Sequence, residues 1–164
     1  MIEAYIGIGS NVGNREENIA KAISLLSEHC KIIKFSSLYE TEPIGYKEQN
    51  WFLNAVVEIE TLHQPANFLL VLQNIERNLG RIRKVKNEPR IIDLDLLLYG
   101  DQVIRQEDLI VPHPELHTRL FVLIPLVEIA PQLMHPTLKK SISELANSCK
   151  TVAKDTVIFL RRLP

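Results

Sequence analysis

The sequence predicts an α+β fold with a ferredoxin-like β-α-β-β-α-β core, in which helices pack on a mainly antiparallel sheet. Three observations lead to this class. Short apolar runs are typical of strands, amphipathic stretches with helical spacing lie between them, and turn-forming residues separate the two. Extra C-terminal helices and one more strand are expected after the core. The whole chain, residues 1–164, is expected to be a single domain.

The first half of the core is predicted to be a strand, a helix and a second strand. Residues 4–8 (AYIGI) are typical of a strand, and residues 9–13 (GSNVG) are typical of a loop. Asn14 can cap a helix, with Glu17 completing a capping box. This helix has an apolar stripe made of Ile19, Ala22, Ile23 and Leu26. The second strand is expected at residues 32–39.

The second half of the core is again strand, helix and strand. Residues 53–60 alternate between the two faces of a strand, and they follow a loop with the sequence TEPIGYKEQN. Residues 66–79 place apolar side chains on one helical face, and Gly80 is a natural end for that helix. Residues 91–99 are predicted to be the fourth strand.

Three elements are expected after this core. A helix over residues 118–128 is predicted to be kinked or broken at Pro125, because proline removes a helical hydrogen bond. A short helix at residues 141–148 and a strand at residues 156–160 complete the chain.

Composition and charge exclude several classes of protein. The chain is 46% hydrophobic and 24% charged with a net charge of −1, which is ordinary for a globular protein and argues against nucleic-acid or membrane binding. Residues 120–131 are apolar but too few to span a bilayer. Cys30 and Cys149 form no ligand or redox motif, so we expect two free thiols in a reducing cytoplasm. A monomer is expected.

The most informative stretch is NEPRIIDLDLLLYGD, residues 87–101, where two aspartates interrupt an apolar run. Asp93 and Asp95 are two residues apart, so on a strand they point to the same face. Two close carboxylates repel, and burying either alone is costly, unless a cation such as Mg²⁺ neutralises both. The alternative is a solvent-facing pair, or a pair salt-bridged to Arg90.

A basic segment precedes the aspartates. Residues 76–90 contain four more cations than acids, and guanidinium and ammonium groups are the usual partners of phosphate oxygens. Alone, such a run is usually a solvated face. Next to metal-binding carboxylates it indicates a polyphosphate–Mg²⁺ site, and therefore transfer or hydrolysis of a nucleotide phosphate. The P-loop, dinucleotide and protein-kinase signatures are missing from the sequence.

Several motifs together resemble the 6-hydroxymethyl-7,8-dihydropterin pyrophosphokinases of folate biosynthesis. They are GSN, SSLYETEPIG, FLNAVVEIET, GRIRK, PRIIDLDLLLYG and VPHPELHTRLFVLIPLVEIAP, in the family's order between residue 5 and about residue 131. The resemblance implies a transferase that moves the terminal diphosphate of ATP onto the pterin's hydroxymethyl oxygen and releases AMP. It also implies ATP as co-substrate and two Mg²⁺ ions bridged by the carboxylates that match Asp93 and Asp95.

The same resemblance implies the remaining site residues. The family's phosphate-binding cations match Arg81, Arg83, Lys84, Arg90, His113 and Arg119, of which Arg81 and Arg90 join the acidic pair as catalytic residues. The helix positions that line the nucleotide site match Gln73 and Glu76. The pterin ring would stack on Phe52 and Phe121, with its edge read by Asn54 and by the backbone of Thr41, Glu42 and Ile44.

Two other functions stay open from the residues alone. A Mg²⁺-dependent nucleotide phosphohydrolase would use the same acidic pair to activate water and would need no pterin pocket. A non-catalytic small-molecule-binding module would leave Asp93 and Asp95 as a surface pair. A zinc site at His113 and His117 is not expected, because Pro112 and Pro114 flank the first histidine.

Overall fold

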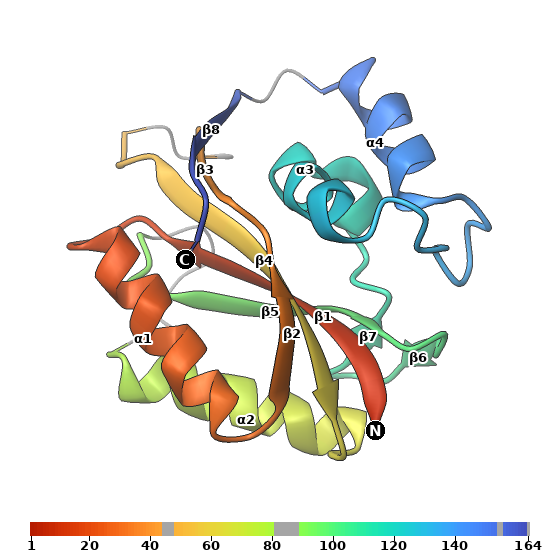
Figure 1. Ribbon diagram of the computed structural model, residues 1–164, viewed down its shortest axis with the longest axis horizontal. Helices are drawn as coiled ribbons and strands as arrows, with labels where there is room; N and C mark the ends of the chain where they lie inside the picture. Colours follow the sequence, from red (N-terminus) through yellow and green to blue (C-terminus); the bar gives the residue numbers. More distant parts are fainter. Residues whose placement is uncertain (44–47, 81–88, 154–155, 164) are drawn as a thin grey trace.

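One antiparallel sheet is the frame of the molecule (Figure 1). The computed structural model describes residues 1–43, 48–80, 89–153 and 156–163. Strands follow one another across the sheet in the order β5-β1-β4-β3-β8, and β2 pairs with the other end of β4. Their bounds are β1 Ile2–Ser10, β2 Lys31–Phe35, β3 Leu38–Thr41, β4 Phe52–Thr61, β5 Asp93–Tyr99 and β8 Val157–Arg161. This order, with antiparallel neighbours throughout, confirms the ferredoxin-like core.

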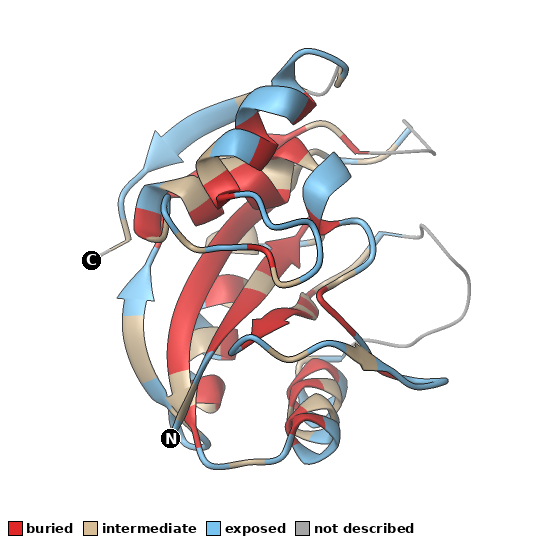
Figure 2. Cartoon of the chain, turned by 90° about the vertical axis from the view of Figure 1, so that its right-hand side faces the viewer, coloured by how far each residue is buried: buried red, intermediate tan, exposed pale blue. Residues whose placement is uncertain are grey.

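Helices cover both faces of the sheet. α1 (Arg15–Ser27) and α2 (Pro65–Asn78) lie on one face, and α3 (Leu120–Ile129) and α4 (Ile142–Lys150) lie on the other (Figure 1). Each face has its own apolar cluster, because alternate side chains of a strand point to opposite sides. The central strands are accordingly buried along most of their length (Figure 2).

Local sequence signals set the helix ends. Asn14 caps α1 by accepting the backbone N–H of Glu17 at 3.2 Å, as predicted, but Glu17 does not complete a capping box and its carboxylate pairs with Lys21 instead. Gly80 follows α2 with a φ of 90°, a left-handed conformation that favours glycine, and its N–H bonds the carbonyl of Arg77 at 3.0 Å. A complete capping box is found at α4, between Ser141 and Glu144.

The predicted strand over residues 32–39 is wrong, since it is two strands, β2 and β3. Ser36 and Ser37 separate them, and both are buried. The hydroxyl of Ser36 accepts the backbone N–H of Val56 at 2.9 Å and donates to the carbonyl of Ser37 at 2.8 Å. Serine hydroxyls that bond nearby backbone compete with the regular ladder, so the strand breaks here.

Two further expectations are corrected. Residues 9 and 10 belong to β1 and not to a loop, because Gly9 pairs with Asn54 on β4. Of the kink or break expected at Pro125, the break is absent, because α3 is one helix from Leu120 to Ile129. The carbonyl that loses its partner to this proline is in the first turn, and buried side chains around Pro125 hold the rest of the helix against the sheet.

Smaller elements complete the chain. A hairpin of β6 (Ile104–Arg105) and β7 (Ile110–Val111) follows β5, and a short 3-10 turn, η1 (Leu116–Thr118), leads into α3. Neither was predicted. Within the described parts of the chain, no helix is both long and apolar enough to cross a membrane.

Candidate active site

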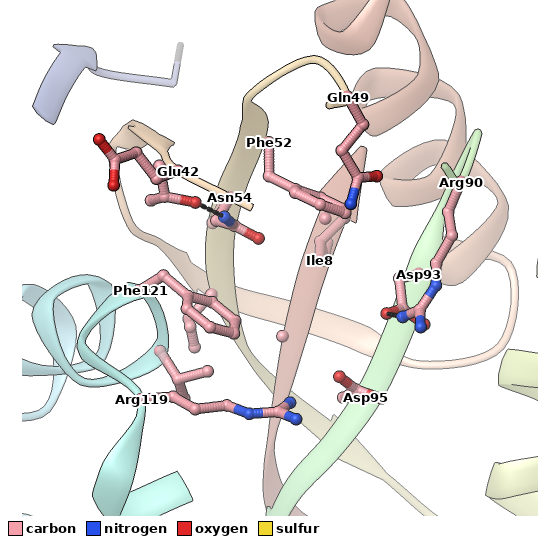
Figure 3. Close-up of a pocket in the computed structure, with 16 residues that line it drawn as sticks. Ile8, Glu42, Gln49, Phe52, Asn54, Arg90, Asp93, Asp95, Arg119 and Phe121 are labelled. Atoms are coloured by element: carbon pink, nitrogen blue, oxygen red, sulfur yellow. Dashed lines mark hydrogen bonds and ion pairs between the residues drawn. The ribbon is translucent and has the colours of Figure 1, made fainter. Parts of the chain in front are cut away.

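A pocket opens on the α3 face of the sheet, where β5, β1 and β4 lie side by side (Figure 3). The space between its walls and across its open mouth is about 820 Å³, a volume that includes open solvent. The lining residues are Gly7, Ile8, Gly9, Thr41, Glu42, Gln49, Phe52, Asn54, Ala55, Val56, Arg90, Asp93, Asp95, Arg119, Phe121 and Val122.

The floor of this pocket is formed by two glycines of β1. Gly9 pairs with Asp93 on one side and with Asn54 on the other, and Gly7 pairs with Asp95 in the same way. A Cβ atom at Gly9 would lie only 2.8 Å from Oδ1 of Asn54, so any side chain there would displace the amide. The sequence signal, a glycine at alternate positions of a strand, marks a close approach of another group.

The acidic wall of the pocket is β5. Asp93 and Asp95 project from its pocket face, as their spacing predicted, and Arg90 forms an ion pair with Asp93 (Figure 3). One alternative from the sequence, a salt bridge to Arg90, is thus present for Asp93. The other alternative, a solvent-facing pair, is not present, since both carboxylates face a pocket. The side chain of Asp93 is 17% exposed there.

These carboxylates fit a magnesium ion. Mg²⁺ is typically held by one or two carboxylates, with water and substrate phosphates completing its shell. Among the residues that the structure describes, no group of three or more histidine, cysteine, aspartate or glutamate side chains could enclose a metal. The two carboxylates that face the pocket are the donor type that suits Mg²⁺.

Glu76 supports β5 from the face of the sheet opposite to the pocket. Its side chain, from α2, is 1% exposed and accepts the backbone N–H of Leu94 at 2.8 Å. Leu94 stands between the two aspartates, on the outer strand of the sheet. Glu76 and Gln73, both predicted to line the nucleotide site, do not line this pocket; Gln73 is partly exposed on α2.

The opposite wall is aromatic. Phe52 at the start of β4 and Phe121 in the first turn of α3 both point into the pocket (Figure 3). Between them lies Asn54, 7% exposed, whose Nδ2 donates to Oγ1 of Thr41 at 2.6 Å. Thr41 and Glu42 line the same wall, whereas Ile44 lies outside the described residues.

The predicted cations are only partly gathered here. The Cζ atom of Arg119 lies 5.5 Å from the ring centroid of Phe121, and its guanidinium points across the pocket toward Asp95 (Figure 3). Arg119 also forms an ion pair with Glu115. Arg81, Arg83 and Lys84 lie outside the described residues.

His113 lines a neighbouring groove instead of this pocket. Its Nδ1 accepts the backbone N–H of Glu115 at 3.2 Å. Burial and then the nearby Arg119 lower the pKa of His113, while the charges of Glu115 and Asp93 partly oppose this. Its ring is therefore a neutral donor through Nε2 at neutral pH.

Asn11 and Gln49 were missed by the sequence reasoning. Asn11 is 1% exposed; its Nδ2 donates to Oε1 of Gln49 at 2.8 Å and to the carbonyl of Asn50 at 3.1 Å. Its Oδ1 accepts the backbone N–H of Arg90 at 2.7 Å. One amide thus joins the phenylalanine side of the pocket to the aspartate side. The signal available was an asparagine directly after a strand, where its amide can bond nearby backbone.

Comparisons with known proteins identify the family of this chain. The family model described as 7,8-dihydro-6-hydroxymethylpterin-pyrophosphokinase (HPPK) matches residues 5–131. A 2-amino-4-hydroxy-6-hydroxymethyldihydropteridine pyrophosphokinase from Bacillus subtilis is 49% identical over 132 residues, 79% of each chain. Another, from Aquifex aeolicus, is 44% identical over 144 residues, 88% of this chain and 90% of the relative.

Solved structures are similar in fold. The crystal structure of wild-type Plasmodium falciparum HPPK-DHPS matches with a TM-score of 0.74 at 18% identity, over 90% of this chain. This chain spans 44% of that longer protein, so the likeness is evidence for the fold alone.

Proposed function

Because this chain belongs to the 7,8-dihydro-6-hydroxymethylpterin-pyrophosphokinase family, we propose that its reaction takes place in the pocket over Gly7 and Gly9. The chain is an ATP-dependent diphosphotransferase of folate biosynthesis that acts on 6-hydroxymethyl-7,8-dihydropterin with Mg²⁺. The observation that carries the location is the pairing across Gly9: a carboxylate on one neighbouring strand and an amide beside two phenylalanines on the other.

Asp93 and Asp95 are the proposed magnesium ligands, and two ions are proposed. The support is a pair of oxygen donors on one strand face that opens to the pocket. Bound Mg²⁺ supplies Lewis-acid stabilisation of negative charge on phosphate oxygens. Glu76 keeps Leu94, and with it the two aspartates, in register through its hydrogen bond to the backbone.

The aromatic wall is the proposed pterin site. A flat heteroaromatic ring needs two apolar faces and a polar edge, and Phe52, Phe121 and Asn54 offer both. The hydrogen bond from Asn54 to Thr41 fixes the amide, so that its Oδ1 faces the space above Gly9 and can accept a ring N–H. Backbone groups of Thr41, Glu42 and Ile44 complete this proposed edge.

The cations are proposed to bind the triphosphate. Arg90, three residues before β5, and Arg119, directly before α3, reach the pocket, and a guanidinium matches phosphate oxygens with two parallel hydrogen bonds. Further contacts are proposed from Arg81, Arg83, Lys84 and His113, and nucleotide contacts from Gln73 and Glu76. Because Glu76 is 1% exposed, its support of β5 is the better-founded role.

The chemistry is a displacement at the β-phosphorus of ATP. The hydroxymethyl oxygen of the pterin forms a bond to that phosphorus, and the bond from the same phosphorus to the oxygen of AMP breaks. The protein's part is to bring the two substrates together in line and to place Arg81 and Arg90 against the charge that develops on the transferring group.

A monomeric single domain in the cytoplasm is proposed as the working form. Its supports are one sheet shared by both halves of the chain, a net charge of −1, and a free thiol at Cys30, as is usual in a reducing compartment.

Product analysis tests the proposal against hydrolysis and against binding only. The protein is incubated with ATP and Mg²⁺, with and without the reduced hydroxymethylpterin, and nucleotides are separated by chromatography. We expect AMP only when the pterin is present, and none when EDTA removes the metal. Phosphate release without pterin would instead indicate a phosphohydrolase, and binding without turnover would indicate a non-catalytic module.

A further inference from the structure

We propose that Arg15, which does not line the pocket, is a positioning residue for the pterin side, because its guanidinium joins the two chain segments that carry Thr41 and Phe52. This inference rests on the pterin site proposed above. It adds a residue that acts through others and touches neither substrate.

The contacts of Arg15 come from one planar group. Its Nη1 donates to the carbonyl of Trp51 at 2.9 Å, and its Nη2 donates to Oε1 of Glu40 at 2.6 Å. Glu40 belongs to β3, and Trp51 directly precedes β4. One guanidinium therefore ties the end of one strand to the beginning of the next.

These two contacts lie next to the pocket wall. Thr41 and Phe52 are a pair in the ladder between β3 and β4, and both line the pocket. The residues that Arg15 holds are the ones immediately before them in the sequence, Glu40 and Trp51. Loss of Arg15 removes this tie next to the positions where the stacking ring of Phe52 and the hydrogen-bond partner of Asn54 are set, while the ladder between β3 and β4 remains.

An arginine at this position has a local cost, which favours a tertiary role. Arg15 is the first residue of α1, and the N-terminal end of a helix disfavours cations. Glu16 and Glu17 supply the acids that this helix end prefers. The pair with Glu40 is also partly shielded from solvent, with side-chain exposures of 28% and 30%, so it is screened less than a surface pair.

The neighbouring ion pair provides a matched control. Arg161 of β8 pairs with Glu16, the next residue of the same helix, and both side chains are more exposed, at 48% and 44%. Neither lines the pocket. Arg161→Gln therefore removes a guanidinium–carboxylate pair from the first turn of α1 without releasing Glu40 or Trp51.

Steady-state kinetics of Arg15→Gln, Arg15→Lys and Arg161→Gln test the inference. We expect Arg15→Gln to raise KM for the pterin roughly tenfold, as two charge-assisted hydrogen bonds are lost, and to leave KM for ATP unchanged. Arg15→Lys should fall between wild type and Arg15→Gln, because an ammonium keeps the charge but cannot span both acceptors. Arg161→Gln should behave as wild type.

Binding measurements separate this proposal from a loss of folding and from the proposed function itself. Pterin affinity is measured by calorimetry with Mg²⁺ and a non-hydrolysable ATP analogue, after circular dichroism has shown that each variant is folded. If Arg15→Gln does not fold, the same measurements are made on Arg15→Lys and Glu40→Gln instead. Equal rises in KM for both substrates, or an unchanged pterin KM in folded variants, would overturn the role of Arg15. If wild type needs no pterin to form AMP, the proposed function fails first.

Discussion

Gly9 lies in β1 between Asp93 on one neighbouring strand and Asn54 on the other. Because glycine has no side chain, the pocket has room above Gly9 in which the proposed pterin ring can lie. At this scale the site consists of single atoms with fixed neighbours: the amide of Asn54 held by Thr41, and the carboxylate of Asp93 held by Arg90. Changes of one methyl group or one charge should therefore have separable effects.

Gly9→Ala is expected to weaken pterin binding. The new methyl group would lie 2.8 Å from Oδ1 of Asn54, so the amide must move away from its bond with Thr41. We expect KM for the pterin to rise about tenfold or more, as a buried hydrogen bond is lost. Gly7→Ala, at the other glycine of the floor, is the comparison and should have a smaller effect, because the atoms nearest to its methyl group belong to Leu97 at an ordinary 3.5 Å. Equal effects of the two changes would contradict this account.

Asp95→Asn is expected to abolish most turnover while the protein stays folded. The substitution keeps the shape of the side chain but removes one of the two charges proposed to hold magnesium. We expect kcat to fall by at least about a hundredfold, since charge stabilisation by the metal is worth several kcal/mol. Asp101→Asn, on the exposed turn after β5, is the control. Near-normal turnover of Asp95→Asn at high Mg²⁺ would remove Asp95 from the proposed site.

Whole strands and helices determine where these atoms lie. β5 is the outermost strand on its side of the sheet, and an outer strand has backbone groups without a strand partner. Glu76 from α2 supplies an acceptor for one of them, the N–H of Leu94. A helix on one face thereby fixes the position of two carboxylates on the other.

Glu76→Leu is expected to destabilise the fold and also to weaken magnesium use. A buried N–H that loses its charged acceptor costs about 1–3 kcal/mol of unfolding free energy. Urea unfolding and the dependence of the rate on Mg²⁺ concentration measure the two effects. Glu76→Gln, which keeps an acceptor oxygen, should lose less of both. A direct nucleotide contact would instead raise KM for ATP in both variants without destabilising them.

Elements with a clear local signal were predictable, and those set by distant contacts were not. The alternation of apolar residues over 53–60 predicted β4, and the glycine after α2 predicted where that helix ends. The break between β2 and β3 depends on Ser36 bonding Val56, twenty residues away along the chain. The spacing of the two aspartates predicted their shared face, but the contacts of Asn11 and Arg15 join residues far apart in sequence.

At the scale of the whole molecule, one sheet separates two apolar clusters. The site lies on the face covered by α3 and α4, and both halves of the chain contribute to it. β5 and Phe121 of α3 come from the C-terminal half, and Phe52 and Asn54 of β4 come from the N-terminal half. His135 lies on this side of the molecule, in the segment before α4, and is 4% exposed. Its Nδ1 accepts the backbone N–H of Leu138 at 3.2 Å.

Stability is expected to fall as the pH drops below the ordinary histidine pKa of 6.5. Burial, and then the nearby His117, lower the pKa of His135, and burial also lowers that of His113. The unfolded chain then takes up protons at a higher pH than the folded one, so this stabilising contribution is present above pH 6.5 and is lost in acid.

Urea unfolding at about pH 7.5 and about pH 5 measures this dependence. His135→Asn should reduce the difference between the two conditions, because an asparagine Oδ1 can replace the Nδ1 acceptor without titrating. His29→Asn, at an exposed histidine, is the control. An unchanged pH dependence in His135→Asn would show that other groups are responsible.

The glycine floor also bears on how this site would respond to an inhibitor. A flat drug resting on Gly9 would occupy the same depth as the proposed substrate, and a single methyl group there would obstruct both. A resistance mutation at Gly9 would therefore impair the cell's own folate supply. Compounds that depend instead on the side chain of Glu42, of which only the backbone is proposed to bind the pterin, would leave the target an easier route to resistance.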